Sequence, residues 1–189
     1  MLPLGHAAFA YLCYVGYRVA SGRPLPVHWA LVPLVLGSQF PDLIDKPLAF
    51  YGLLPSGRTL AHSIFTAFAT IAVIRFGVER FGRPESEPLA RLYDIGPTAF
   101  AIGYLTHLAG DLVNPLLVGD PSKGRFLLWP VSRTVYYSET TASPVARVLS
   151  VYRDGSAYPQ LELVVLAGVV FLFLEVRYRT RQRPRSASN

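Results

Sequence analysis

The chain has 189 residues, of which 51% are hydrophobic and only 16% are charged. A soluble domain usually contains about a quarter charged residues, so this composition is typical of a membrane protein. The single cysteine, Cys13, excludes an internal disulfide and a zinc site built from cysteines, and the arginines behind the net charge of +6 follow apolar segments, which argues against a nucleic-acid partner.

Five apolar segments follow one another along the chain, and we expect each to form a helix. They cover about residues 4–20, 29–40, 60–78, 97–118 and 158–178. A helix that spans a bilayer needs about 20 residues. The last three segments reach this length, the first nearly does, and the second is short, with Pro33 expected to kink it or to begin it. Because the alternation typical of strands is weak, the predicted fold class is all-α, an integral membrane bundle of about five apolar helices.

Polar connectors separate these segments. The stretch 79–94 is rich in proline, glycine and charge, and the stretch 119–157 is the longest connector, with a short amphipathic helix predicted over 144–152. The chain shows no internal repeat. We therefore predict a single membrane-embedded domain over residues 1–178 and a basic, disordered, cytoplasmic tail over 179–189.

Arginines gather after the first, third and fifth apolar segments. They are Arg18 and Arg23, then Arg75, Arg80, Arg83 and Arg91, then Arg177, Arg179, Arg181, Arg183 and Arg185. With five crossings, all three clusters fall on one side of the membrane, and such an excess of basic residues predicts the cytoplasmic side. The sequence thus predicts a multi-pass protein of the cell (inner or plasma) membrane, with membrane lipid as a partner and a cytoplasmic C-terminus.

Six histidine and aspartate side chains are candidates for chemistry: His6, Asp42, Asp45, His62, His107 and Asp111. Asp111 follows His107 by one helical turn, so these two share a face, and Asp42 and Asp45 would do the same in a helix. In the five-helix topology all six lie towards the outer ends of their helices and converge at one depth. An ionisable group inside a membrane helix costs several kcal/mol and is by default a functional candidate.

Neutral imidazoles and carboxylates together are typical ligands of a divalent metal ion, with zinc expected first and manganese as the alternative. For His107 and Asp111 alone, a structural hydrogen bond between the two is the competing interpretation. Arg58, four residues before His62, is predicted to bind an anionic substrate group or a carboxylate of the site, or else to anchor the chain at the membrane surface. His28 is predicted to be an interfacial residue away from the cluster.

Several short motifs occur in a fixed order over about residues 1–131. They are His6, the segment Gly37–Asp45, the segment Arg58–Ser63, the segment Gly103–Asp111 and Trp129–Pro130. In this order the chain resembles the YdjM-like family of membrane-bound metal-dependent hydrolases of bacteria and archaea. Their pattern is an N-terminal histidine, Gly-x-x-x-Pro-Asp-x-Asp, His-Arg-Gly-x-Thr-His-Ser, and Gly-x-x-x-His-x-x-x-Asp followed by Trp-Pro. The chain departs from it at Ile44, which lengthens the Asp-x-Asp spacing, and at Gly57 and Ala61, which replace a histidine and a threonine.

The resemblance implies a hydrolase in which the six histidines and aspartates bind one or two divalent ions. The family is in turn distantly similar to zinc-dependent phospholipase C and P1 nuclease, helical enzymes that cleave phosphoesters. The expected substrate is therefore a small-molecule or lipid phosphoester, attacked by a metal-bound hydroxide. Asp42 or Asp45 would orient the water as a general base, and Arg58 completes the predicted catalytic residues.

Three other functions remain open at this point. The same residues would suit a transporter or ion-handling membrane protein, whose pathway would open to both faces. They would also suit a non-catalytic scaffold that keeps a metal site. The third alternative is a soluble helical domain, which would need no detergent.

Overall fold

The computed structural model describes residues 1–25, 28–117, 119–132, 143–155 and 158–182. Over these ranges the chain forms the α-helices α1 (Pro3–Ala20), α2 (Leu31–Phe50), α3 (Ile64–Phe81), α4 (Glu87–Leu117), α5 (Pro144–Arg153) and α6 (Tyr158–Gln182), and the 3-10 helices η1 (His28–Ala30) and η2 (Pro121–Leu128). No strand occurs in these ranges, which confirms the prediction of an all-α fold.

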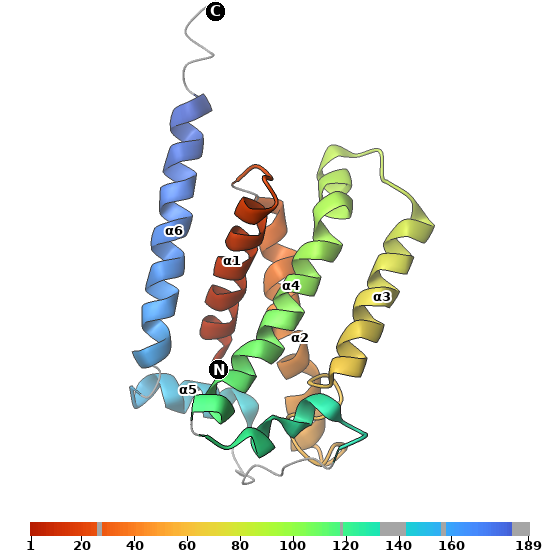
Figure 1. Cartoon of the computed structure of the whole chain (residues 1–189), viewed down its shortest axis with the longest axis vertical. Coiled ribbons are helices and arrows are strands. Elements are labelled where there is room, and N and C mark those ends of the chain that lie inside the picture. The colour runs from red at the N-terminus through yellow and green to blue at the C-terminus, as the bar shows by residue number, and fades with distance from the viewer. Residues whose placement is uncertain (26–27, 118, 133–142, 156–157, 183–189) are drawn as a thin grey trace, which may run out of the picture.

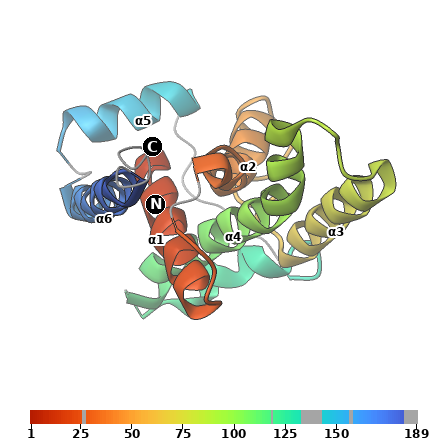
Figure 2. The same cartoon turned by 90° about the horizontal axis from the view of Figure 1, so that it is seen from above.

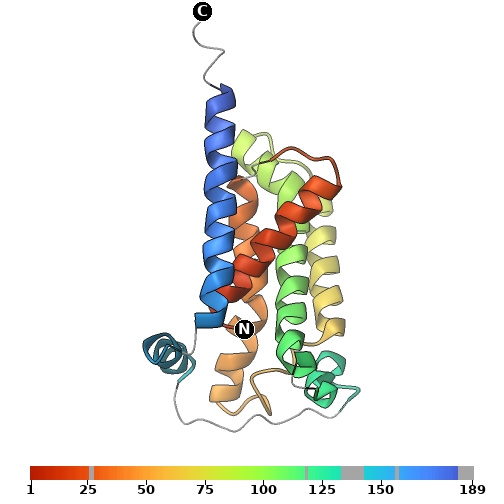
Figure 3. The same ribbon diagram turned by 60° about the vertical axis from the view of Figure 1, so that its left-hand side comes forward.

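The helices α1, α2, α3 and α4 form a bundle, and α4 is central because it packs against the other three (Figure 1). α6 packs along α1 on the outside of the bundle, as the view from above also shows (Figure 2). α5 lies across the end of the bundle at which α1 begins (Figure 3). Since successive long helices run in opposite directions, the start of α1, the end of α2, the start of α3 and the end of α4 share this end.

Two glycines bring α2 and α4 into backbone contact. A Cβ atom built on Gly37 would lie 2.2 Å from the carbonyl oxygen of Phe100, and one built on Gly103 would lie 2.2 Å from the carbonyl oxygen of Leu34. Real Cβ atoms do not approach a backbone this closely. Only glycine therefore allows this crossing, which sets how near the polar residues of the two helices come to each other.

Small and aromatic residues fill the space between the helices. One buried cluster joins Ala10 and Tyr14 of α1 to Leu34 of α2 and Ala99 of α4. A second joins α3 to α4 through Ala67, Tyr104 and Leu108. Alanine at a contact lets helix axes approach closely, and the two clusters together fix α4 against α1, α2 and α3.

The predicted and observed helices agree closely in three cases, two with continuous apolar residues and one with an amphipathic pattern. α1, α3 and α5 begin and end within a few residues of their predicted bounds. By contrast, α2 does not end near Phe40 but continues through Pro41 and Pro47, and α4 begins at Glu87, inside the predicted connector 79–94. α6 continues to Gln182, past the predicted start of the disordered tail at Arg179, and the remainder of that tail, 183–189, lies outside the described residues.

In the described part of the chain, no helix is at once long enough and apolar enough to cross a membrane. The structure therefore does not support the prediction of about five spanning helices. Charged side chains interrupt the longer apolar stretches, for example Arg75 and Glu79 in α3 and Glu162, Glu175 and Arg177 in α6.

Candidate metal centre

The five side chains that face one another come from four parts of the fold. They are His6 in the first turns of α1, Asp42 in α2, His62 in the loop before α3, and His107 and Asp111 in α4. The three histidines and Asp111 are buried, and Asp42 is mostly buried. The structure thus brings five of the six predicted residues together.

Ser63 fixes the start of α3 and, with it, the position of His62. Its hydroxyl accepts a hydrogen bond from the backbone N–H of Phe65 at 3.2 Å, as an N-cap residue does, and donates one to the carbonyl of Trp129 at 2.6 Å. Tyr104 of α4 holds the same loop from the other side, because its hydroxyl donates to the carbonyl of Ala61 at 2.7 Å. The loop that carries His62 is therefore tied to both α4 and the segment after η2.

The Tyr104→Phe variant tests this tie. Loss of the hydroxyl leaves the buried carbonyl of Ala61 without its donor, so the free energy of unfolding is expected to fall by about 1 kcal/mol. Thermal or denaturant unfolding in detergent measures the change. Tyr51→Phe, in an exposed residue of the same loop, is the control and is expected to unfold like the wild type. Equal stability of all three proteins would show that the Tyr104 hydroxyl contributes nothing.

Asp45 lies behind His62 rather than beside the other site atoms. Its carboxylate accepts hydrogen bonds from the backbone N–H groups of Thr59 and Ala61 at 2.8 Å each and of His62 at 3.1 Å. The Nδ1–H of His62 donates to Asp45 Oδ2 at 2.8 Å. Both carboxylate oxygens are thereby used, so Asp45 orients His62 and does not present an atom to a metal ion. A histidine ligand held through its second nitrogen by a carboxylate is a common arrangement in metal proteins.

His107 is oriented in the same way by the backbone of α2. Its Nδ1 lies 2.6 Å from the carbonyl oxygen of Ser38. A carbonyl oxygen only accepts hydrogen bonds, so Nδ1 carries the proton and Nε2 keeps its lone pair. The two imidazoles of His62 and His107 therefore point their Nε2 atoms forward, away from the groups that hold them.

The forward atoms of the five side chains form two groups with metal-ligand spacing, His6 with His107 and Asp111, and Asp42 with His62 and His107. His62 Nε2 is 3.2 Å from His107 Nε2 and 3.5 Å from both Asp42 Oδ1 and Asp111 Oδ2. His107 Nε2 is 3.8 Å from Asp42 Oδ1, and His6 Nε2 is 3.3 Å from Asp111 Oδ1. Two ligand atoms of a tetrahedral zinc ion, each about 2.0–2.1 Å from it, are roughly 3.4 Å apart. The observed separations fit this value.

His6 supplies a second observation in favour of a metal ion. It is buried, its ring stacks on that of His107 with centroids 3.8 Å apart, and neither of its nitrogens makes a well-aligned hydrogen bond within the described part of the chain. A buried polar group without a partner is costly. A cation beside Asp111 would use the lone pair of His6 and remove this cost.

The charges in the site show which groups are ready to bind a cation. Burial opposes protonation of His62, but hydrogen bonds to the carboxylates of Asp111, Asp42 and Asp45 outweigh it and raise the pKa of His62 to about 10. Burial, together with the neighbouring His6, lowers the pKa of His107 to about 3. His107 is therefore neutral, as a ligand must be, whereas the metal-free site keeps a proton on His62.

Both forward-facing carboxylates are ionised. Burial raises the pKa of Asp42, but the hydrogen bond with His62 and the charge of Lys46 lower it by more, so the pKa of Asp42 lies below its ordinary value. Burial also opposes ionisation of Asp111, but the nearby imidazoles of His6 and His62 and the charge of Arg58 hold its pKa well below the ordinary value. A divalent ion would take the place of the proton that His62 carries between these two carboxylates.

Three cationic groups contact the carboxylates from outside. Arg58 Nε lies 2.8 Å from Asp111 Oδ2, which places Arg58 on a site carboxylate, one of the two contacts predicted for it. The Met1 ammonium lies 2.6 Å from Asp111 Oδ1, and Lys46 Nζ lies 2.6 Å from Asp42 Oδ2. Sequence reasoning missed Lys46, although its position one turn after Asp42 would have indicated the pair.

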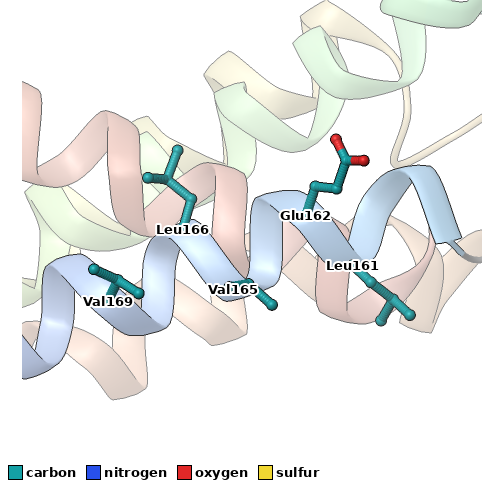
Figure 4. A pocket seen from close by; sticks show the side chains of 5 residues that line it. All are labelled: Leu161, Glu162, Val165, Leu166 and Val169. Carbon is teal, nitrogen blue, oxygen red and sulfur yellow. The ribbon is translucent and has the colours of Figure 1, made fainter.

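Other features of the chain lie away from the centre. His28 Nε2 lies 2.5 Å from Glu175 Oε2 and so joins η1 to α6, away from the cluster as predicted. Figure 4 shows a pocket on one face of α6, lined by Leu161, Glu162, Val165, Leu166 and Val169. None of the predicted site residues lines this pocket.

Comparison with known proteins points to one family. The model of the family described as YdjM inner membrane protein matches residues 1–183. No curated protein and no solved structure matches the chain. The predicted distant similarity to zinc-dependent phospholipase C and P1 nuclease is not shown by these comparisons and stays a prediction.

Proposed function

The chain belongs to the YdjM inner membrane protein family, and with that as premise we propose that it is a membrane metal-dependent hydrolase acting on a phosphoester. One observation carries the proposal: the Nε2 atoms of His62 and His107 lie 3.2–4.0 Å from each other and from the facing oxygens of Asp42 and Asp111, while Asp45 and Ser38 hold the histidines from behind. This spacing of two imidazole nitrogens and two carboxylates, with the other histidine nitrogens already held, is the one that the ligands of a divalent ion adopt.

The residues present fit one divalent ion per chain, with zinc first and manganese second in preference. Two groups of potential ligands exist among the described residues, His6 with His107 and Asp111, and Asp42 with His62 and His107. They share His107, whose Nδ1 is occupied by Ser38. Its one free nitrogen binds only one ion, so ligands from both groups would serve the same ion.

The protein groups around the ion would divide the remaining work. A divalent ion supplies Lewis acidity and lowers the pKa of a water molecule beside it. Asp42 is the residue best placed to orient that water and accept its proton, because Asp42 Oδ1 faces the imidazoles and the side chain is 10% exposed. Asp45, the other base predicted from the sequence, is fully engaged by backbone N–H groups and by His62.

A lipid or other amphiphile is the substrate class that we favour. An apolar groove between α1, α2 and α6 begins at Leu4, two residues before His6, and continues past Tyr11 to Phe171. An acyl chain could lie along such a groove while a polar head reaches the end of the bundle. The membrane setting of the family supports the same choice.

The metal content of the protein purified in detergent tests the first half of the proposal. The wild type is expected to hold about one divalent ion per chain, as a single site of this ligand type does. In the His6→Phe variant a ring still stacks on His107 while a ligand is lost, so the metal content is expected to fall. The metal-free protein loses the 3.3 Å contact of His6 Nε2 with Asp111 Oδ1. His28→Ala is the control and should keep its metal.

Hydrolysis tests the second half. Phosphodiester lipids in mixed micelles are expected to be cleaved by the metal-loaded wild type, not by His6→Phe, and not after removal of the metal with a chelator. A protein that holds its ion but cleaves no phosphoester would favour the non-catalytic metal site. The metal centre itself would be refuted if the purified wild type held no metal and if, with zinc added to both proteins, it were no more stable than His6→Phe.

A further inference from the structure

Lys46 lies where the metal centre meets solvent. It follows Asp42 by one turn of α2, and its ammonium group contacts Asp42 Oδ2 at 2.6 Å. The side chain is 33% exposed, whereas the imidazoles behind it are fully buried. An ammonium group has three donors, so it can keep Asp42 and still offer donors to a molecule that approaches from outside.

Arg58 has the equivalent place on the second carboxylate. Its Nε donates to Asp111 Oδ2 at 2.8 Å, its side chain is 26% exposed, and its guanidinium lies 5.8 Å from the ring centroid of Phe126. Asp42 Oδ1 and Asp111 Oδ2 are each 3.5 Å from His62 Nε2. Lys46 and Arg58 therefore each contact one of the two carboxylates that lie 3.5 Å from His62 Nε2.

The loop of Arg58 also packs on Lys46. A Cβ atom built on Gly57, the residue before Arg58, would lie 3.4 Å from Lys46 Cγ. The absence of a side chain at position 57 thus leaves room for the stem of Lys46 beside the loop. The stem of Lys46 therefore lies against the loop that carries Arg58, although the two residues come from different elements.

Charge explains what Lys46 and Arg58 would attract. The carboxylates of Asp42, Asp45 and Asp111 carry three negative charges, and Lys46 and Arg58 carry two positive charges beside them. A divalent ion held by neutral imidazoles adds two positive charges, so these groups then carry a net positive charge beside partly exposed donors. Excess charge in a largely buried site is compensated by a ligand of opposite sign.

We propose that Lys46 and Arg58 form an anion-binding pair that holds the phosphoryl group of the substrate when the metal ion is bound. This proposal rests on the proposed function and adds Lys46 to it as a substrate-binding residue. Arg58 has a planar guanidinium group with five N–H donors, and Lys46 has a compact charge on a flexible stem. Both suit the oxygens of a phosphate group, and neither suits a neutral substrate.

Inorganic phosphate and manganese provide a direct test with the full-length protein in detergent. Paramagnetic broadening of the phosphorus resonance reports phosphate bound near Mn²⁺, and the manganese content of each sample is measured separately. The wild type is expected to broaden the resonance only when it is loaded with manganese. In Lys46→Met, phosphate affinity should fall about tenfold, as expected for loss of one charge-assisted hydrogen bond, with manganese content unchanged.

Two further variants complete the test. Lys46→Arg retains the charge and should keep most of the phosphate affinity, and Lys123→Met removes a lysine paired with Asp120 on η2 and should behave as the wild type. Wild-type phosphate affinity in manganese-loaded Lys46→Met would overturn the pair and leave the metal centre standing. Loss of manganese from Lys46→Met but not from Lys46→Arg would make Lys46 a support of the metal ligands, which also overturns the pair. A wild type that binds no manganese would overturn the metal centre and the pair together.

Discussion

Replacing Asp45 with asparagine is expected to lower the free energy of unfolding by about 3 kcal/mol, because it removes a buried charge that accepts four hydrogen bonds. The native carboxylate has only acceptors, whereas an amide has an NH₂ group in place of one oxygen. That NH₂ group would face backbone N–H groups that now donate to Asp45, and two donors repel each other. The loop from Thr59 to His62 loses its anchor. Chemical unfolding of the detergent-solubilised protein, followed by circular dichroism, measures the loss.

The same variant should also weaken metal binding about tenfold or more, since the second nitrogen of His62 is no longer held by a carboxylate. Asp94→Asn is the matched control. Asp94 is an exposed aspartate of α4 that pairs with Arg83, and its replacement should leave both stability and metal binding nearly unchanged. If Asp45→Asn binds metal and unfolds like Asp94→Asn, Asp45 has no orienting role.

A methyl group added at Gly103 is expected to force α2 and α4 apart. The new Cβ atom would lie 2.2 Å from the carbonyl oxygen of Leu34 and 2.8 Å from the backbone nitrogen of Ser38, and backbone atoms cannot rotate away as a flexible side chain does. Overpacking of this kind typically costs 1–3 kcal/mol, and we expect about 3 kcal/mol here because both contacts are with backbone. The displaced α2 would also withdraw the Ser38 carbonyl from His107, so metal affinity should fall.

Gly96→Ala, on the same helix, is the matched control for Gly103→Ala. A Cβ atom at Gly96 meets nothing within 4 Å, and alanine favours a helix over glycine by up to about 1 kcal/mol. The two variants should therefore change the unfolding temperature in opposite directions. An equal or positive shift for Gly103→Ala would contradict the close crossing of α2 and α4.

The helices that could be predicted from the sequence are those whose apolar residues are continuous or, as in α5, recur with helical periodicity. α2 illustrates the limit, because its second half carries Pro41 and the aspartates Asp42 and Asp45, and such a composition predicts the end of a helix. These polar residues face the metal centre or its supporting loop instead of solvent. Their burial depends on partners from other elements, which hydropathy along one segment does not reveal.

The candidate site, like the helices, could be predicted from the sequence only in part. Residue type and spacing sufficed to select the histidines and aspartates, because few other ionisable groups lie within apolar segments. They did not separate Asp42 from Asp45, since the two are three residues apart and share a helix. Asp42 lies near Nε2 of His62 and Asp45 near its Nδ1. This difference depends on how the loop 51–63 folds back over α2.

The acceptor that fixes the tautomer of His107 belongs to the main chain at position 38. Every amino acid carries that carbonyl, so exchange of the side chain there leaves the acceptor in place. A change that alters the tautomer must instead shift the backbone of α2, and such a change can arise at any residue on which the position of that helix depends. Variants that impair the chemistry of His107 should consequently map to the α2–α4 contact as well as to the residues around its ring.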